Sequence, residues 1–190
     1  MKIGLFFGSF NPIHVGHLII STYVLNISSA QEVWFIVSPQ NPFKKNDELL
    51  DEHARLKLVE KAISGNRAMK ISRVEFKLPR PSFTVDTLSY LEEKHPDHEF
   101  LLIMGSDSFQ QLDKWKDFEK IIAKHKILVY RRPGFEIETK LNAEIEILNA
   151  PLLGISSTEI RDLIKHGKSI RYLVPEKVRK EIKKNEYYKK

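Results

Sequence analysis

The sequence predicts an α/β protein, with a Rossmann-like, doubly wound parallel sheet, flanking helices and a small helical C-terminal end. Apolar runs of strand length alternate along the chain with segments whose apolar residues recur at helical spacing. The strand-like runs are continuously apolar, which is typical of strands buried on both faces. Alternation of buried strands and helices favours a parallel sheet covered by helices.

The expected elements follow one another without a clear linker or internal repeat. Strands are expected at residues 3–7, 33–37, 69–76, 100–104, 127–130 and 145–148. Helices are expected from residue 15, at 52–63, 84–94 and 118–123, and in two closing segments that open at Ser156 and Pro175. Ser156 and Glu159 have capping-box spacing, and proline favours a first helical turn. We therefore expect one domain over residues 1–190, of which 155–190 is a helical C-terminal part.

Composition excludes several classes of protein. The chain has 190 residues, 42% hydrophobic and 29% charged, so it is long and apolar enough to bury a core. It contains no cysteine, which rules out disulfide scaffolds, iron–sulfur clusters, thiolate zinc sites and cysteine nucleophiles. No apolar run approaches the ~18–20 residues of a membrane span. The run at 3–7 is too short for a signal peptide, so we expect a cytoplasmic protein without a membrane partner.

Most of the net charge of +6 lies in the C-terminal segment. Residues 175–190 hold seven Lys or Arg against three Glu, which leaves the rest of the chain nearly neutral. A nucleic-acid footprint is expected on a face of the body rather than in a tail. We therefore expect a solvated terminal helix and no nucleic-acid partner.

Chemistry is expected where the strands end. Parallel sheets of this kind bind ligands beyond the carboxyl ends of their strands, where the strand order reverses. Site residues should then follow Phe7, Val37, Met104 and Tyr130. The first of these positions carries Gly-Ser-Phe-Asn-Pro-Ile-His-Val-Gly-His at residues 8–17.

This ten-residue run predicts a phosphate site. Gly8 permits a tight turn and a close backbone approach to a ligand. His14 and His17 are three residues apart, so at a helix start both rings lie on one face. Exposed N–H groups and the helix dipole favour an anion there. The alternative is a strand–turn–helix in which the two histidines only cap the helix.

Two signatures together resemble a known family. Residues 8–17 look like the signature of nucleotidyltransferases with an HxGH motif, and Ile-Ser-Ser-Thr-Glu-Ile-Arg at 155–161 is similar to their second signature. Between them lie Asn-Pro-Phe-Lys at 41–44, Pro-Ser-Phe-Thr-Val-Asp-Thr-Leu at 81–88, Gly-Ser-Asp at 105–107, Trp115 and Arg-Pro-Gly at 132–134. In this order they resemble the bacterial nicotinate-nucleotide adenylyltransferases, over residues 3 to about 175.

The resemblance implies that ATP and nicotinate mononucleotide give nicotinate adenine dinucleotide and pyrophosphate. The nucleophile of that reaction is a phosphate that is already ionised at neutral pH, so no general base is needed. Catalysis then consists of positioning and of charge stabilisation. The sequence agrees, because it shows neither a nucleophile–base constellation nor a Walker-type Gly-Lys-Ser/Thr.

The resemblance also implies roles for individual residues. The expected catalytic residues are His14, His17 and Arg161. The expected ATP-binding residues are Gly8, Ser9, Phe10, His14, His17, Gly105, Asp107, Ile155, Ser156, Ser157, Thr158 and Arg161. Asp107 would accept a hydrogen bond from a ribose hydroxyl, and its alternative role is to cap a helix. A helix cap alone is likewise the alternative for Ser156.

Four further residues are expected at the mononucleotide. Lys44 would meet its phosphate, Thr84 the pyridine carboxylate, and Trp115 would stack on the ring, while Arg132 would line the pocket. Their alternatives are a solvated lysine, a helix N-cap and a core tryptophan. The family often has His where this chain has Phe43, so the contact of that His has no counterpart here.

No protein metal site is expected. A divalent cation, Mg²⁺, should accompany the ATP phosphates, held by substrate and water. The closest alternative acceptor is nicotinamide mononucleotide, followed by a small acceptor of the pantetheine-phosphate type. A non-catalytic nucleotide or RNA binder is the alternative from another class. The sequence does not predict the oligomeric state.

Overall fold

The centre of the protein is a parallel β-sheet. A computed structural model describes residues 1–39, 49–137 and 141–189. Within these residues six strands pair in the order β3-β2-β1-β4-β5-β6, and every neighbouring pair is parallel. The strands are β1 (Lys2–Gly8), β2 (Glu32–Val37), β3 (Met69–Ser72), β4 (Glu99–Gly105), β5 (Ile127–Tyr130) and β6 (Ile145–Leu148). The predicted fold class is confirmed.

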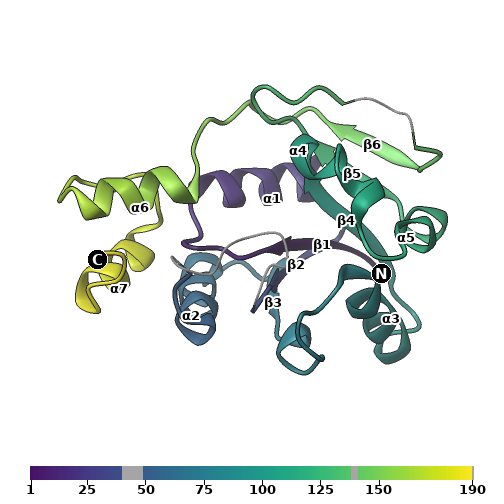
Figure 1. Ribbon diagram of the computed structural model, residues 1–190, viewed down its shortest axis with the longest axis horizontal. Coiled ribbons are helices and arrows are strands. Elements are labelled where there is room, and N and C mark those ends of the chain that lie inside the picture. The colour runs from purple at the N-terminus through teal and green to yellow at the C-terminus, as the bar shows by residue number, and fades with distance from the viewer. Residues whose placement is uncertain (40–48, 138–140, 190) are drawn as a thin grey trace.

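Helices connect the strands and close the chain (Figure 1). They are α1 (Val15–Ile27), α2 (Glu52–Ile63), α3 (Thr84–Lys94), α4 (Ser106–Phe109), α5 (Phe118–Lys124), α6 (Ser157–Lys165) and α7 (Glu176–Lys184), with 3₁₀ turns η2 (Val74–Phe76) and η3 (Leu112–Lys114). None of the helices in the described ranges is long and apolar enough to cross a membrane.

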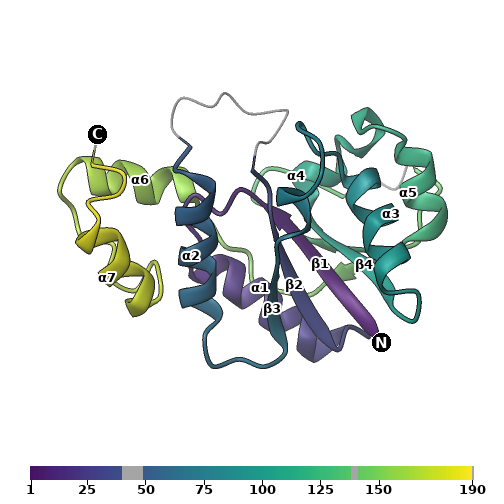
Figure 2. The ribbon, with the colours of Figure 1, turned by 90° about the horizontal axis from the view of Figure 1, so that it is seen from below.

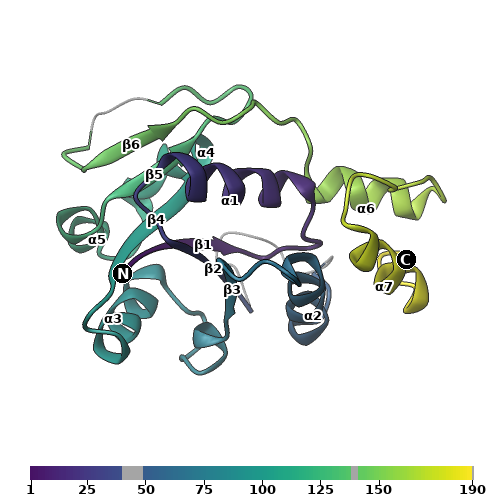
Figure 3. The same ribbon diagram turned by 180° about the vertical axis from the view of Figure 1, so that it is seen from behind.

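The sheet separates two hydrophobic cores because side chains alternate along each strand. On one face, Phe6 of β1 packs with residues of α1, α2, α6 and α7. On the other face, Ile3 and Leu5 of the same strand pack with residues of α3, α4 and α5. Figure 3 shows α1 lying along the sheet, and Figure 2 shows α7 beside α2 and far from α3.

The strand order reverses between β1 and β4, which both lie in the middle of the sheet. Gly8 at the end of β1 is in register with Val37 of β2, and Gly105 at the end of β4 is in register with Tyr130 of β5. The carboxyl ends of these four strands therefore form one edge, where the sequence predicts the site.

Several predicted boundaries differ from the structure by one residue, and that of the third strand differs by more. The strand expected at 69–76 ends at Ser72, where its pairing with Ile36 of β2 also ends. The chain then forms η2, because Phe76 N–H donates to the Arg73 carbonyl over 3.2 Å. Alternating apolar residues do not distinguish a strand from such a turn. The last helix begins at Glu176, and Pro175 is its N-cap rather than its first residue.

Candidate active site

The turn after β1 is fixed by side chains from the end of the chain. Phe10 adopts the left-handed backbone conformation, with φ of 45°. Arg161 of α6 donates from Nη1 to the Asn11 carbonyl over 3.0 Å, and the Ser157 hydroxyl donates to the Pro12 carbonyl over 2.9 Å. The two predicted signatures therefore meet, although about 150 residues separate Asn11 from Arg161 in the chain.

The two histidines lie at the start of α1. His14 is its N-cap and His17 is its third residue, and their ring centroids are 3.7 Å apart. The backbone N–H of His14 donates to Nδ1 of His17 over 3.2 Å. A neutral His17 ring that accepts at Nδ1 carries its proton on Nε2, which makes Nε2 a hydrogen-bond donor.

His14 is a neutral group at physiological pH. Only 4% of its surface is exposed. Burial, together with the positive charge of Arg132, lowers the pKa of His14 to about 4. His14 is thus a dipolar ring rather than a fixed cation, and the fixed positive charges of the site come from arginines.

Helix α6 presents the second signature to the first. Ser156 is its N-cap, and its hydroxyl accepts from the Glu159 N–H over 3.2 Å, which confirms the predicted cap. Arg161 also donates from Nη2 to the Thr158 hydroxyl over 3.4 Å. Ser156 therefore caps the helix that carries Thr158 and Arg161, so its two predicted roles are compatible.

Gly16 lets the two signatures touch. A Cβ atom at this position would lie 2.7 Å from Cγ2 of Ile155 and 2.9 Å from Nδ1 of His14. Both distances are shorter than carbon side chains tolerate. The glycine is therefore required by the close approach of helix α1 to the segment before α6.

A hollow at the sheet edge collects residues of both signatures. It is lined by Phe6, His14, Gly16, His17, Ile20, Tyr130, Arg131, Arg132, Pro151, Leu153 and Ile155. Two imidazoles and the Arg132 side chain supply polar groups, and the remaining wall is largely apolar. These polar groups suit an anionic group of a ligand.

A carboxylate lies next to Arg132, one of the residues that line this hollow. Asp107 lies in α4, with Oδ1 3.6 Å from Nε of Arg132. The Ser106 hydroxyl accepts from the Arg132 backbone N–H over 2.9 Å. A Cβ at Gly105 would collide with the Asp107 carboxylate, so glycine lets Asp107 fold back over the strand end. The N-cap of α4 is Gly105, so Asp107 is not a cap.

A second hollow opens beside the first. It is lined by Phe6, Phe7, Leu102, Ile103, Met104, Gly105, Ser108, Trp115, Tyr130. Phe6 and Tyr130 line both hollows and so form the wall between them. Trp115 is half-buried at the end of η3 and packs against the second core, as its alternative role requires, while also facing this hollow.

The predicted acceptor residues are not all in one place. Trp115 lines the second hollow, whereas Arg132 lines the first, beside His14. Thr84 is the half-buried first residue of α3, whose N-cap is Phe83, so Thr84 is not the cap. Lys44 and Phe43 lie outside the described residues.

Three residues of this region were not among the predicted site residues. Tyr130 ends β5, and burial raises its pKa to about 12, so its hydroxyl keeps its proton. Glu75 is buried and accepts from the hydroxyls of Ser82 and Thr87 over 3.0 and 3.1 Å, and burial raises its pKa. Arg55 is fully buried in α2. Position at the carboxyl end of a strand is the one clue for Tyr130.

Comparisons with known proteins agree with this geometry. A family model described as cytidylyltransferase-like matches residues 5–163. A probable nicotinate-nucleotide adenylyltransferase of Cytophaga hutchinsonii is 49% identical over 189 residues, covering 99% of this chain and 98% of its own. A protein of the same name from Flavobacterium johnsoniae is 48% identical over 193 residues and covers all of both chains. The chain belongs to the nicotinate-nucleotide adenylyltransferase family.

A solved structure extends the comparison to the fold. The nicotinic acid mononucleotide adenylyltransferase of Plasmodium falciparum, complexed with NaAD, superposes with a TM-score of 0.83 at 21% identity, covering 98% of this chain and 97% of its own. As a member of the nicotinate-nucleotide adenylyltransferase family, the chain is a nucleotidyltransferase and an enzyme of NAD biosynthesis.

Proposed function

We propose that this chain transfers the adenylyl group of ATP to the phosphate of nicotinate mononucleotide, giving nicotinate adenine dinucleotide and pyrophosphate. The observation that carries the proposal is the meeting of the two signatures at the end of β1, where Arg161 and Ser157 bind the carbonyls of Asn11 and Pro12. A second hollow, with Trp115 in its wall, shares Phe6 and Tyr130 with the first hollow, which residues of both signatures line. Two adjoining hollows suit a reaction that joins two nucleotides.

The first hollow is assigned to ATP. His17 donates from Nε2 to the α-phosphate, where negative charge accumulates as the acceptor phosphate attacks and pyrophosphate leaves. His14 is neutral and donates or accepts as a dipole beside it. Ser156, Ser157, Thr158 and Arg161 bind the β- and γ-phosphates at the start of α6.

The remaining ATP contacts come from two strand ends and from the segment before α6. Gly8 ends β1 and is followed by Ser9 and Phe10, and Gly105 ends β4 shortly before Asp107. Ile155, in the segment before α6, abuts the base or ribose. Asp107 accepts from a ribose hydroxyl. Because Arg132 lines this hollow and lies 3.6 Å from Asp107, its proposed role is to orient that carboxylate as well as to meet substrate.

The second hollow is assigned to the mononucleotide. Trp115 offers a π-face on which the pyridine ring stacks. Thr84 and the N-terminus of α3 meet the ring carboxylate, which is anionic and so is favoured by the helix dipole. Lys44 meets the mononucleotide phosphate. This last assignment rests on the family resemblance alone.

The nucleotidyltransferase family generally uses a divalent cation, and we assign Mg²⁺. Among the described residues no three His, Cys, Asp or Glu side chains gather to hold a metal ion. The donors that face the first hollow are basic, and Asp107 is paired with Arg132. This donor set fits a cation held by phosphate oxygens and water. Asp107 is the carboxylate that would contact such a cation. When bound, the cation supplies charge neutralisation on the triphosphate.

The test is a pyrophosphate-release assay with ATP and Mg²⁺, with product masses confirmed. Nicotinate mononucleotide, nicotinamide mononucleotide and phosphopantetheine are offered separately. We expect the highest kcat/KM with nicotinate mononucleotide. A preference for the nicotinamide acceptor would keep the phosphate assignments and overturn those of Thr84 and Trp115. Turnover with phosphopantetheine alone would overturn the assignment of the second hollow.

The proposal also covers the setting of the enzyme. We assign the reaction to the cytoplasm, and the unit that performs it to one domain over residues 1–190, with ATP and nicotinate mononucleotide as its partners. Nucleic-acid binding by the basic C-terminal segment is not part of the function. A salt-dependent RNA shift in a filter-binding assay would contradict this.

A further inference from the structure

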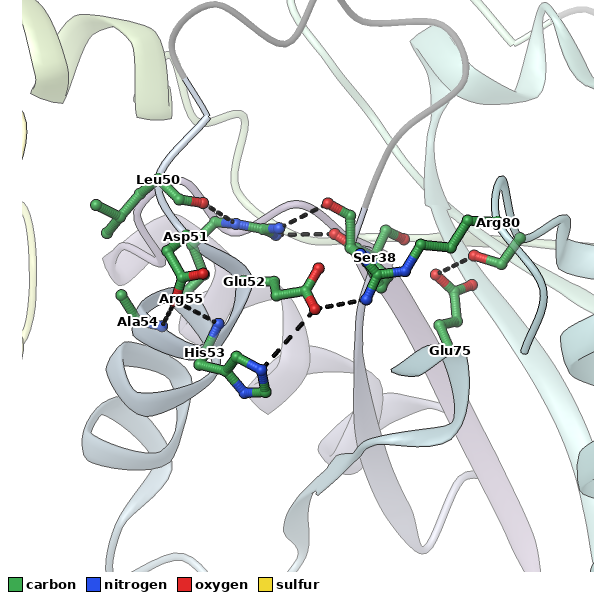
Figure 4. Close-up of polar contacts among 11 residues, drawn as sticks. Ser38, Leu50, Asp51, Glu52, His53, Ala54, Arg55, Glu75 and Arg80 are labelled. Carbon is green, nitrogen blue, oxygen red and sulfur yellow. Dashed lines mark hydrogen bonds and ion pairs between the residues drawn. The ribbon is translucent and has the colours of Figure 1, made fainter. Parts of the chain in front are cut away.

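Arg55 is a buried cation held by backbone carbonyls alone (Figure 4). Its Nε donates to the Leu50 carbonyl over 2.8 Å, and its Nη2 donates to the Pro39 carbonyl over 2.9 Å. Its Nη1 donates to the carbonyls of Ser9 over 2.6 Å and Ser38 over 2.8 Å. Within the described ranges it forms no ion pair.

The four acceptors belong to separate segments of the active-site edge. Ser9 follows β1 in the first signature, and Ser38 and Pro39 follow β2. Leu50 precedes α2, and its N–H donates to Oδ1 of Asn11 over 3.2 Å. One guanidinium therefore holds the ends of two neighbouring strands and the start of the helix that follows them.

Burying a charged side chain in this way lowers the stability of the folded chain unless other interactions offset the lost hydration. Burial lowers the pKa of Arg55 below its usual range, while the guanidinium stays charged. Four carbonyl dipoles offset the lost hydration, in a fork geometry that no other side chain reproduces. An apolar residue at this place in α2 would fill the core and leave four carbonyls in need of partners.

The bond to Ser9 has a consequence for the substrate. The Ser9–Phe10 peptide is trans, because the cis bonds of the described residues are those before Pro12 and Pro81. In a planar trans peptide the C=O and the N–H point in opposite directions. Since the Ser9 carbonyl faces Arg55, the N–H of Phe10 faces away from α2. Phe10 belongs to the turn assigned to the ATP phosphates.

Arg55 of α2 and Arg161 of α6 bind the same turn from two helices that are far apart in the sequence. Arg55 holds the Ser9 carbonyl and Arg161 holds the Asn11 carbonyl, with the left-handed Phe10 between them. A residue in that conformation keeps its place only when its surroundings fix it. The two arginines supply that constraint.

We propose that Arg55 is a positioning residue of the adenylyl transfer, which orients the Ser9–Phe10 peptide and aligns the ends of β1 and β2 without touching either substrate. It rests on the proposed function, in which that turn binds the ATP phosphates. Misalignment of the reacting phosphates by a fraction of an ångström lowers kcat more than it weakens substrate binding.

The first test is R55K, which keeps the charge and most of the side-chain volume but loses the fork. We expect kcat to fall about 10- to 100-fold, with the KM for ATP changed by less than about threefold. The matched control is V59A, one turn further along α2, where Val59 is fully buried and lies in the first core. It should lower the Tm and leave kcat within about twofold, measured well below the Tm of each variant.

The second test is chemical rescue. R55A removes the guanidinium and leaves a cavity of its shape, and millimolar methylguanidinium should restore kcat several-fold. The same additive should leave V59A unchanged. Tm is followed in parallel, because the additive at this level should change kcat more than it changes stability.

Several results would overturn the proposal. They are a folded R55K with kcat within about threefold of the wild type, a V59A that loses as much kcat as R55K, or an R55K that does not fold at all. Failure of the wild-type chain to transfer adenylyl to any acceptor would instead count against the proposed function. Comparison of variant with wild type therefore separates the two failures.

Discussion

The part of the site assigned to the ATP phosphates (the phosphate end) and the part assigned to the pyridine ring of the acceptor (the ring end) are built differently. At the phosphate end, His14 is 4% exposed. Three of the four carbonyls from residue 9 to residue 12 are bound there by side chains, namely those of Arg55, Ser157 and Arg161. At the ring end, Thr84 and Trp115 are half-buried and come from separate elements, α3 and η3. Under the proposed function, the transfer from ATP therefore uses a preorganised turn, whereas acceptor recognition uses side chains from two separate local elements.

The sharpest test of the phosphate end is H17A. Loss of the Nε2 donor at the α-phosphate should lower kcat by about 100- to 1,000-fold, the range for removing one preorganised donor. Steady-state kinetics and the Tm are measured together. A kcat within about threefold of the wild type would show that His17 does not stabilise the transition state.

The burial of His14 predicts a pH-dependent stability. Its pKa is about 4 in the folded chain and near 6.5 when unfolded, so the unfolded state takes up the proton first as the pH falls. Stability from this group is present above pH ~6.5 and is lost towards pH ~4, by on the order of 3 kcal/mol. Denaturant unfolding of the wild type and H14Q between these values checks it. Parallel curves would contradict the burial of a neutral ring.

G16A tests whether the two signatures must touch. The added methyl would lie 2.7 Å from Ile155, so α6 and its preceding segment would have to shift. We expect a loss of about 1–3 kcal/mol of stability, as for other overpacked positions, together with lower kcat. G154A is the matched control, because a Cβ there meets nothing within 4 Å. Equal effects of the two changes would refute the close approach.

The smallest effect is expected at the ring end. W115A should raise the KM for nicotinate mononucleotide about tenfold, the scale of one stacking contact, and leave that for ATP nearly unchanged. Separate titration of each substrate measures both values. If both KM values rise together, Trp115 acts through the core rather than on the ring, and the contrast between the two ends is lost.

Most strands and helices could be predicted from the sequence because each depends on a pattern within a few neighbouring residues. Continuous apolar runs marked the strands, and the Ser156 cap marked the start of α6. The strand at 69–76 was overextended, since Val74 and Phe76 alternate as strand residues do while the partner strand has already ended. For the site, the two signatures were informative because each is contiguous in sequence.

The features that the sequence did not predict depend on contacts between residues that are far apart in the chain. Arg132 lines the first hollow, apart from Trp115, because β5 ends beside β4, and its contact with the mononucleotide stays a prediction. The burial of Glu75 and Arg55 was not predicted, because the sequence alone does not distinguish a buried charged residue from a solvated one. Arg55 did leave a clue: it shares a helix face with Val59 and Ile63, where an apolar residue is expected.

The hydrogen bond between Arg161 and Asn11 also affects the order in which the chain folds during synthesis. Its two partners are among the first and the last parts of the domain to leave the ribosome, so closing this contact requires a loop of nearly the whole chain. The sheet can pair strand by strand during synthesis, but the turn after β1 is held in place only when α6 emerges. A chain cut short before residue 155 would thus hold all six strands and lack Ser157 and Arg161, the two side chains of α6 that bind this turn.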